Sequence, residues 1–270
     1  MRRIVHLSDI HFGRTNCTVV ERLVGAVSEL EPHVVVVSGD LTQRAKRKQF
    51  AEARTFLDEI PKPQIIVPGN HDVPLYNIFK RFLEPLDNYK EFISSDLTPF
   101  YSDEEIAVIG INTARSFTLK SGRVNNEQVE EIRRRLDPLS DDLIKVVVTH
   151  HPFDLPDGYD DDAIVGRAGK LIPKIAECGA DIFLSGHLHV SSITNSAHRY
   201  RMANGWQALI IQAGTAASTR GRGEANSFNL IEIQAPFLEV KRYECSVPPE
   251  GFVLGTSEKF TQTERGWSRM

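Results

Sequence analysis

The feature that most constrains the fold of this chain is a series of short β-branched runs separated by helical segments. Runs such as HVVVVSGD, EIAVIGIN and LIKVVVTH are almost entirely apolar, which is typical of strands buried on both faces of a sheet. Residues 18–30 and 46–60 place apolar side chains at helical spacing, and 125–136 and 169–179 are two further candidate helices. The pattern predicts a layered α/β sandwich. The closely spaced final runs FNLIEIQ and FLEVKRYE predict an antiparallel end to a sheet.

Oxygen- and imidazole-bearing residues follow the carboxyl ends of five of these runs. In α/β sheets, ligands bind outside the carboxyl ends of the strands, so residues distant in sequence converge there. A single histidine at a strand end is more often a hydrogen-bonded structural residue than a metal ligand. Five of the nine histidines belong to this set, however, which chance placement explains poorly. The set comprises Asp9, His11, Asp40, Asn70, His71, His150, His187 and His189.

The residue types in this set indicate a centre with two metal ions. Seven ligands are too many for one ion, but they suit two ions if Asp40 bridges them and solvent completes the coordination. Two ions about 3.5–4 Å apart can stabilise both the attacking and the leaving oxygen in phosphoryl transfer. Mixed imidazole and carboxylate donors suit manganese, iron, zinc or cobalt better than magnesium, and the lack of a thiolate disfavours structural zinc. The seven candidate ligands are Asp9, His11, Asp40, Asn70, His150, His187 and His189.

Glycines adjoin several candidate ligands. Gly39, Gly69 and Gly186 stand where the chain must turn at a strand end. Glycine reaches positive φ without steric cost, so we expect these three residues to supply it.

Composition narrows the class of protein. The 270 residues carry a net charge of −4, which argues against bulk electrostatic binding of nucleic acid, and no segment approaches the roughly 18 apolar residues of a membrane span. Three widely spaced cysteines form no disulfide or zinc pattern. The N-terminus MRRIVHLSDIHF reads as a first strand and not as a signal peptide, so a cytoplasmic location is expected. We expect one catalytic domain, residues 1–245, followed by a tail, 246–270, without a core role.

The residues at the strand ends form the motifs DIH, GD, GNHD, THH and GHLH, which extend from Asp9 to His189. This five-part pattern resembles that of the calcineurin-like metallophosphoesterase superfamily. The stretches INTARS, SGRVNNEQ and QAGTAASTRGRG are similar to those of class III cyclic-nucleotide phosphodiesterases. The resemblance implies a four-layer αββα sandwich of two mixed sheets, with a dinuclear metal site at the carboxyl ends of the strands.

The resemblance also implies a role for each motif residue. A hydroxide bound to the metals would be the nucleophile. His71 would be the catalytic residue that faces the substrate and assists the leaving group, as a general acid or a charge stabiliser. His150 is assigned as a ligand because it ends VVVTH, whereas His151, which is followed by Pro152, is expected either to support a ligand or to be structural. One ion would be held by Asp9, His11, Asp40 and His189, and the other by Asp40, Asn70, His150 and His187.

The expected function is hydrolysis of a small phosphodiester such as a 3′,5′-cyclic nucleotide. A phosphomonoesterase or a nucleotide pyrophosphatase of the same fold is the alternative. A DNA nuclease is disfavoured by the acidic charge balance, and a non-catalytic metal-binding scaffold is disfavoured because every motif position is filled. The expected partner is a small-molecule phosphate ester, with no nucleic acid polymer and no membrane, and homo-oligomerisation is left open.

Several other residues have two interpretations. Asp72 either orients His71 or stabilises a turn, and His6 is expected to be a packed histidine. Asn112 and Arg115 are candidates to reach the cleft, with a turn cap as the alternative for Asn112. Arg220 and Arg222 are candidates for bidentate phosphate contacts, with solvent exposure as the alternative.

Overall fold

Two mixed β-sheets pack face to face in the computed structural model, which describes residues 1–116, 121–156, 159, 163–200, 205–220, 223–246 and 251–270. The first sheet has the strand order β13-β12-β11-β10-β1-β2-β3, and the second has the order β4-β5-β6-β7-β9-β8. The first sheet consists of β1 (Arg2–Leu7), β2 (Val34–Val37), β3 (Gln64–Ile66), β10 (Ser227–Gln234), β11 (Phe237–Cys245), β12 (Phe252–Thr263) and β13 (Gly266–Arg269). The second consists of β4 (Phe100–Ser102), β5 (Ile106–Gly110), β6 (Ile144–Val148), β7 (Ala180–Ser185), β8 (Ser192–Asn195) and β9 (Leu209–Gln212).

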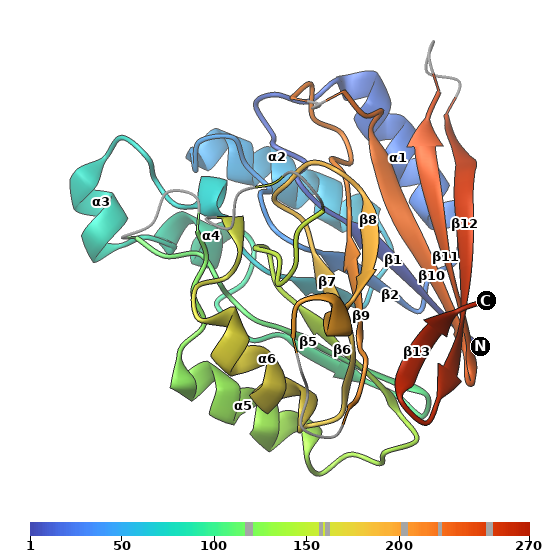
Figure 1. Ribbon diagram of the computed structural model, residues 1–270. Helices are drawn as coiled ribbons and strands as arrows, with labels where there is room; N and C mark the ends of the chain where they lie inside the picture. The colour runs from blue at the N-terminus through green and yellow to red at the C-terminus, as the bar shows by residue number, and fades with distance from the viewer. Residues whose placement is uncertain (117–120, 157–158, 160–162, 201–204, 221–222, 247–250) are drawn as a thin grey trace.

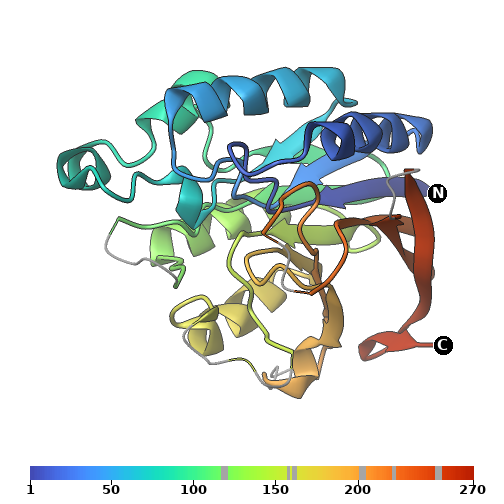
Figure 2. The ribbon, with the colours of Figure 1, turned by 90° about the horizontal axis from the view of Figure 1, so that it is seen from above.

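Helices cover the outer face of each sheet, which gives the four layers seen from above in Figure 2. Two short 3-10 turns, η1 (Asn70–Asp72) and η3 (Ser196–His198), lie in the connections. The expected layered α/β sandwich is confirmed. The helices are α1 (Cys17–Glu29), α2 (Arg47–Glu59) and α4 (Asp87–Phe92) on the first sheet, α5 (Asn126–Leu136) and α6 (Ala168–Ala176) on the second, and the protruding α3 (Ile78–Leu83).

Alternation along the strands explains the layers. Val35 and Val37 of β2 contact the core beneath α1 and α2, whereas Val34 and Val36 contact the core between the sheets. Successive side chains of a strand point to opposite faces, so an unbroken valine run supplies both cores. A third apolar core lies between the second sheet and helices α5 and α6.

The predicted helix limits agree with the structure to within a few residues. Asn125 is the N-cap of α5: its side chain accepts from Gln128 N at 2.9 Å, and Gln128 Oε1 accepts from Asn125 N at 3.1 Å. Pro173 lies inside α6, and Gly179 follows that helix with a φ of +80°. The sequence patterns did not indicate α3 or α4.

The expectation of a C-terminal tail without a core role is wrong. Residues 252–263 and 266–269 form β12 and β13, which extend the first sheet. Trp267 is fully buried and Phe260 is 3% exposed, and both belong to the core between the sheets. Trp267 N donates to Gln207 O at 3.0 Å, so the last strand is tied to the loop before β9.

None of the described helices is long and apolar enough to cross a membrane.

Candidate metal centre

The candidate ligands come from the carboxyl ends of strands in both sheets. Strands β1, β2 and β3 run parallel in the first sheet, and β6 and β7 run parallel in the second. Their carboxyl ends meet where the two sheets face each other. This edge collects all seven predicted ligands, namely Asp9, His11, Asp40, Asn70, His150, His187 and His189.

The first group of donor atoms consists of Asp9 Oδ1, His11 Nε2, Asp40 Oδ2 and His189 Nε2. His189 Nε2 lies 3.2 Å from Asp9 Oδ1, and His11 Nε2 lies 3.7 Å from the same oxygen. His11 Nε2 and His189 Nε2 are 3.1 Å apart, and Asp40 Oδ2 lies 3.6 Å from His11 Nε2. All four residues are buried, and their donor atoms lie within 4.8 Å of one another.

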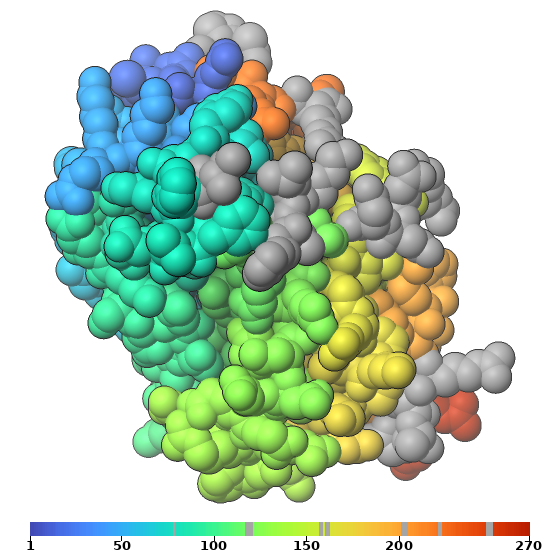
Figure 3. Space-filling view, turned by 90° about the vertical axis from the view of Figure 1, so that its left-hand side faces the viewer, coloured from blue at the N-terminus to red at the C-terminus, as the bar shows by residue number. Residues whose placement is uncertain are grey.

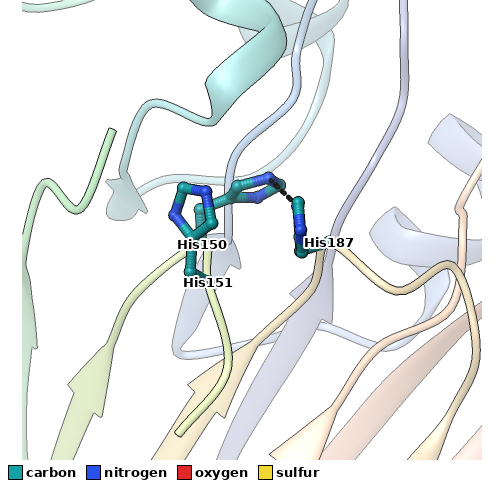
Figure 4. Close-up of side chains that lie close together, drawn as sticks. All are labelled: His150, His151 and His187. Atoms are coloured by element: carbon teal, nitrogen blue, oxygen red, sulfur yellow. Dashed lines mark hydrogen bonds between the residues drawn. The ribbon is translucent and has the colours of Figure 1, made fainter. Parts of the chain in front are cut away.

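The second group consists of Asp40 Oδ1, Asn70 Oδ1, His150 Nε2 and His187 Nδ1. Asn70 Oδ1 is 3.0 Å from both ring nitrogens, which are themselves 3.3 Å apart. Figure 4 shows the rings of His150 and His187 turned toward each other. Asp40 Oδ1 lies 3.4 Å from His150 Nε2, so the carboxylate of Asp40 presents one oxygen to each group.

Whether these donor atoms suit a metal ion can be judged from their hydrogen bonds. Asp9 Oδ1 is buried and has no hydrogen-bond partner among the described residues. An unpaired buried carboxylate oxygen is costly, and the two facing Nε2 atoms of His11 and His189 have only one proton to share in a single hydrogen bond. A cation in the middle of the group would satisfy all of these atoms at once. The donor set is therefore suited to a metal.

Charge interactions within the site shift several pKa values. Burial alone would raise the pKa of Asp9 and of Asp40, but neighbouring histidines outweigh it and hold both pKa values well below the usual range. Burial lowers the pKa of His150, yet the interaction with Asp40 raises it to about 9. His150 Nδ1 donates to Ser38 O at 2.8 Å, which directs Nε2 into the site. A metal ion at Nε2 would displace a proton from this ring.

The backbone at the site is strained. Five of the seven candidate ligands have positive φ, between 51° and 74°, namely Asp9, His11, Asp40, His187 and His189. A side chain in this region costs of order 1–3 kcal/mol and persists only where surrounding contacts impose it. Backbone hydrogen bonds from Asp9 N to Gly39 O and from His11 N to Asp40 O join the loops after β1 and β2. These contacts fix the donor atoms.

Only one of the three glycines beside the ligands has the predicted positive φ. Gly39 has a φ of +92°, as predicted, but Gly69 has a φ of −100° and Gly186 is not among the residues with positive φ. Gly69 is required by close approach instead, because a Cβ there would lie 2.1 Å from Asp40 Oδ1. Apart from Gly39, the left-handed conformation is adopted by five of the candidate ligands themselves.

His71 lies beside the two groups of donors. Its backbone N donates to Asp40 Oδ1 at 2.8 Å, and its ring Nδ1 donates to Gln43 O at 3.0 Å. Arg220 Nη1 lies 3.1 Å from Nε2, and Arg44 Nη1 lies 3.4 Å from Nδ1. Burial lowers the pKa of His71, and the charge of Asp40 opposes that shift. Gln43 and Arg44 were not singled out from the sequence, although they follow Asp40 in the stretch GDLTQR.

Asp72 stabilises a turn and does not contact the ring of His71. Its oxygens accept from the backbone N of Leu41, Thr42 and Gly69 at 3.1, 2.8 and 2.9 Å. The second of the two interpretations of this residue is therefore the observed one.

His151 packs against the second group of donors. Its ring centroid lies 4.7 Å from that of His187 and 4.9 Å from that of His150, and Figure 4 shows the three rings together. His151 Nδ1 shares a hydrogen bond of 2.8 Å with Thr113 Oγ1. A Cβ at Gly122 would lie 2.5 Å from the ring, so the site leaves just enough space for it.

Other candidate residues lie outside the site or have structural roles. Arg115 donates to the carbonyl oxygens of Asn112 and Ala114 and contacts Gln128 Oε1, so it stabilises its own loop. His6 is fully buried in β1 and hydrogen-bonds Ser38 Oγ at 2.9 Å, as expected for a packed histidine. Arg222 lies outside the described residues.

An αββα sandwich with buried carboxylate and imidazole donors at the strand ends is an arrangement that suits a metal-dependent hydrolase. Residues 2–191 match the family model described as calcineurin-like phosphoesterase, and the chain belongs to that family. The chain is thus an enzyme that hydrolyses phosphate esters, from a family with dinuclear metal sites.

Two curated relatives are similar over most of their length. A probable cyclic nucleotide phosphodiesterase of Synechococcus sp. is 24% identical over 204 residues, which cover 70% of this chain and 74% of the relative. The glycerophosphodiester phosphodiesterase GpdQ of Enterobacter lignolyticus is 23% identical over 214 residues, which cover 74% of each chain.

Solved structures share the fold at low identity. A purple acid phosphatase from yellow lupin has a TM-score of 0.68 at 12% identity; the match covers 96% of this chain but only 53% of the lupin chain. A dimetal phosphatase from Danio rerio has a TM-score of 0.63 at 13% identity, and the match covers 94% of this chain and 98% of the phosphatase chain.

Proposed function

We propose that this chain is a dinuclear metal-dependent phosphodiesterase of small molecules, with a 3′,5′-cyclic nucleotide as the favoured substrate. The observation that carries the proposal is the position of Asp40, whose two oxygens face two separate groups of donor atoms. The names of the two curated relatives, both phosphodiesterases, support the choice of a diester.

The proposed ligands divide between two ions, chosen from manganese, iron, zinc and cobalt. Asp40 would bridge them. When bound, the two ions would supply an activated water and the positive charge that stabilises phosphoryl transfer. Asp9, His11, Asp40 and His189 would hold one ion, and Asp40, Asn70, His150 and His187 the other.

The chain's own contribution is preorganisation. The first group of donors is buried, and the strained backbone at Asp9, His11 and Asp40 is locked by hydrogen bonds between the loops. Donors that do not need to reorganise during the reaction stabilise developing charge more effectively than mobile ones. The positions of the donor atoms are therefore set when the chain folds and not when substrate binds.

His71 is proposed to protonate the leaving oxygen from Nε2. Its Nδ1 is occupied by Gln43 O, which fixes the ring and leaves Nε2 for the substrate. The free protein favours a neutral ring because burial lowers its pKa. A negatively charged phosphate beside Nε2 would favour the protonated form, so the proton donor would be formed when substrate is present. A new bond would form between the attacking water oxygen and phosphorus, while the bond from phosphorus to the leaving oxygen breaks and that oxygen takes the proton from Nε2.

Arg220 is proposed to bind a non-bridging phosphate oxygen. Its side chain is exposed and its Nη1 lies 3.1 Å from His71 Nε2, the atom proposed to face the substrate. A guanidinium prefers a phosphate oxygen to a neutral imidazole. Substrate would therefore take over this contact and release Nε2.

The test is an assay of the metal-free protein after loading with each of the four metals in turn. Bis(p-nitrophenyl) phosphate, p-nitrophenyl phosphate, a 3′,5′-cyclic nucleotide and a glycerophosphodiester would be compared, with Asp40→Ala as the control. We expect turnover of all three diesters, with the cyclic nucleotide preferred to the glycerophosphodiester and the monoester slowest. Absence of turnover by the metal-loaded protein would refute the proposal, and a faster monoester would identify a phosphomonoesterase instead.

A further inference from the structure

Four large apolar side chains stand exposed on one small helix and the turn that precedes it. Tyr76, Phe79 and Leu83 are 77%, 80% and 77% exposed, and Phe82 is 46% exposed. We call Tyr76, Phe79 and Leu83 the α3 surface. Helix α3 projects from the body of the molecule in Figure 1, and this side of the molecule faces the viewer in Figure 3. Contiguous exposed apolar side chains of this size commonly mark an interaction site.

The helix that carries this surface is firmly anchored. Arg81, only 7% exposed, donates from Nε to Ser116 O at 2.6 Å and from Nη1 to Pro74 O at 3.1 Å. Asn77 caps the helix by accepting from Lys80 N at 3.0 Å. Arg81 thus ties the helix to the loop at Ser116, while Phe79 and Leu83 are directed outward. This is the opposite of the usual arrangement for a surface helix.

The size of the α3 surface suits the centre of a protein interface. Two aromatic rings and a leucine at these exposures offer roughly 400 Å² of apolar area. A stable interface buries about 800 Å² on each partner, with an apolar centre and a polar rim. The α3 surface would therefore supply about half of what one partner needs, and the exposed polar residues around it would supply the rim.

The charges beside the surface favour a second copy of this chain as the occupant. Lys80 and Glu84 are both exposed, four positions apart on the segment. If two copies pack antiparallel about a two-fold axis, Lys80 of each copy faces Glu84 of the other, and Phe79 and Leu83 meet between them. The net charge of −4 and the nearby Glu84 and Asp87 do not favour an anionic membrane as the occupant.

We propose that the α3 surface is the centre of an isologous dimer interface. The proposal concerns assembly and does not depend on the proposed function.

Sedimentation velocity of the full chain at micromolar concentrations tests this assembly. The native protein should sediment as a dimer, and the double variant Phe79→Ser with Leu83→Ser should sediment as a monomer. The matched control is Val253→Ser with Leu254→Ser on β12, where two apolar side chains are also about half exposed, and it should remain a dimer.

Charge exchange gives a second and more specific test. Lys80→Glu alone and Glu84→Lys alone should each weaken the dimer about tenfold, and the two changes together should restore it. A monomeric native protein, a dimer that survives the double serine change, or failure of the charge exchange to restore assembly would overturn the proposal. Cosedimentation of the monomer with vesicles of phosphatidylcholine and phosphatidylserine would overturn it in favour of a lipid surface.

Discussion

One oxygen of Asp72 accepts hydrogen bonds from both the backbone N and the hydroxyl of Thr42, at 2.8 and 3.0 Å. The other oxygen accepts from the backbone N of Leu41 and Gly69. Asp72 is buried, so it joins the loop after β2 to the turn after β3 without help from water. The first loop carries Asp40 and the second carries Asn70 and His71. Their relative positions therefore depend on a residue that touches no substrate.

Replacement of Asp72 by Ala should lower the free energy of unfolding by about 2–4 kcal/mol, because three buried backbone N–H groups lose their acceptor. Urea denaturation of the metal-free protein measures this change. Asp58→Ala removes an exposed carboxylate that is paired with Arg54 on α2, and it should cost far less, because solvent screens an exposed ion pair. Equal losses in the two variants would contradict the role given to Asp72.

Replacement of His71 by Gln should reduce kcat about 10²- to 10⁴-fold for a diester with an alkyl leaving group. The loss should be much smaller for a p-nitrophenyl ester, whose leaving oxygen needs little protonation. Metal content should be unchanged, because His71 is not among the proposed ligands. Equal losses for the two leaving groups would exclude proton donation, and a loss of metal would make His71 a ligand.

Replacement of His151 by Ala should weaken binding of the ion at Asn70, His150 and His187 about tenfold. The ring of His151 packs 4.7 Å from that of His187, so its removal frees that ring to rotate. Phe at the same position keeps the packing and should retain most of the affinity. Calorimetric metal titration distinguishes the two variants, and native affinity in the alanine variant would refute a positioning role.

Replacement of Asp181 by Asn should stabilise the protein at high pH. Asp181 lies at the start of β7, at the opposite edge of the sheet, and burial raises its pKa to about 6. A folded pKa above the unfolded value means that the native state binds the extra proton. Stability is then fully present at low pH and falls as pH rises through about 6, by up to about 3 kcal/mol.

Asn cannot ionise, so the stability difference between the Asp181→Asn variant and the native protein should grow in the variant's favour between about pH 4 and pH 7. Urea denaturation across this range measures it. A difference that does not change with pH would show that Asp181 keeps an ordinary pKa.

The sequence predicted those features of the structure that depend on the residue types within one strand or on where a strand ends. Val34 to Val37 read as a strand buried on both faces, and they contact two different cores. The seven candidate ligands could be predicted to converge because parallel strands bring their carboxyl ends to one edge.

Features that depend on contacts between distant segments were not predictable. Strand β12 is exposed over most of its length and lacks the apolar alternation of a strand, although Trp267 after it is buried. The positive φ at Asp9 and His11 follows from hydrogen bonds to the loop after β2, which no local pattern reveals. The contact of His71 with Gln43 depends in the same way on how two loops pack.

Anomalous diffraction from crystals of the manganese-loaded protein tests whether Asp40 bridges two metal ions. We predict two peaks about 3.5–4 Å apart, one on each side of the Asp40 carboxylate. One peak should lie among Asp9, His11 and His189, and the other among Asn70, His150 and His187. A single peak, or two peaks that do not share Asp40, would rule out a dinuclear centre bridged by this carboxylate.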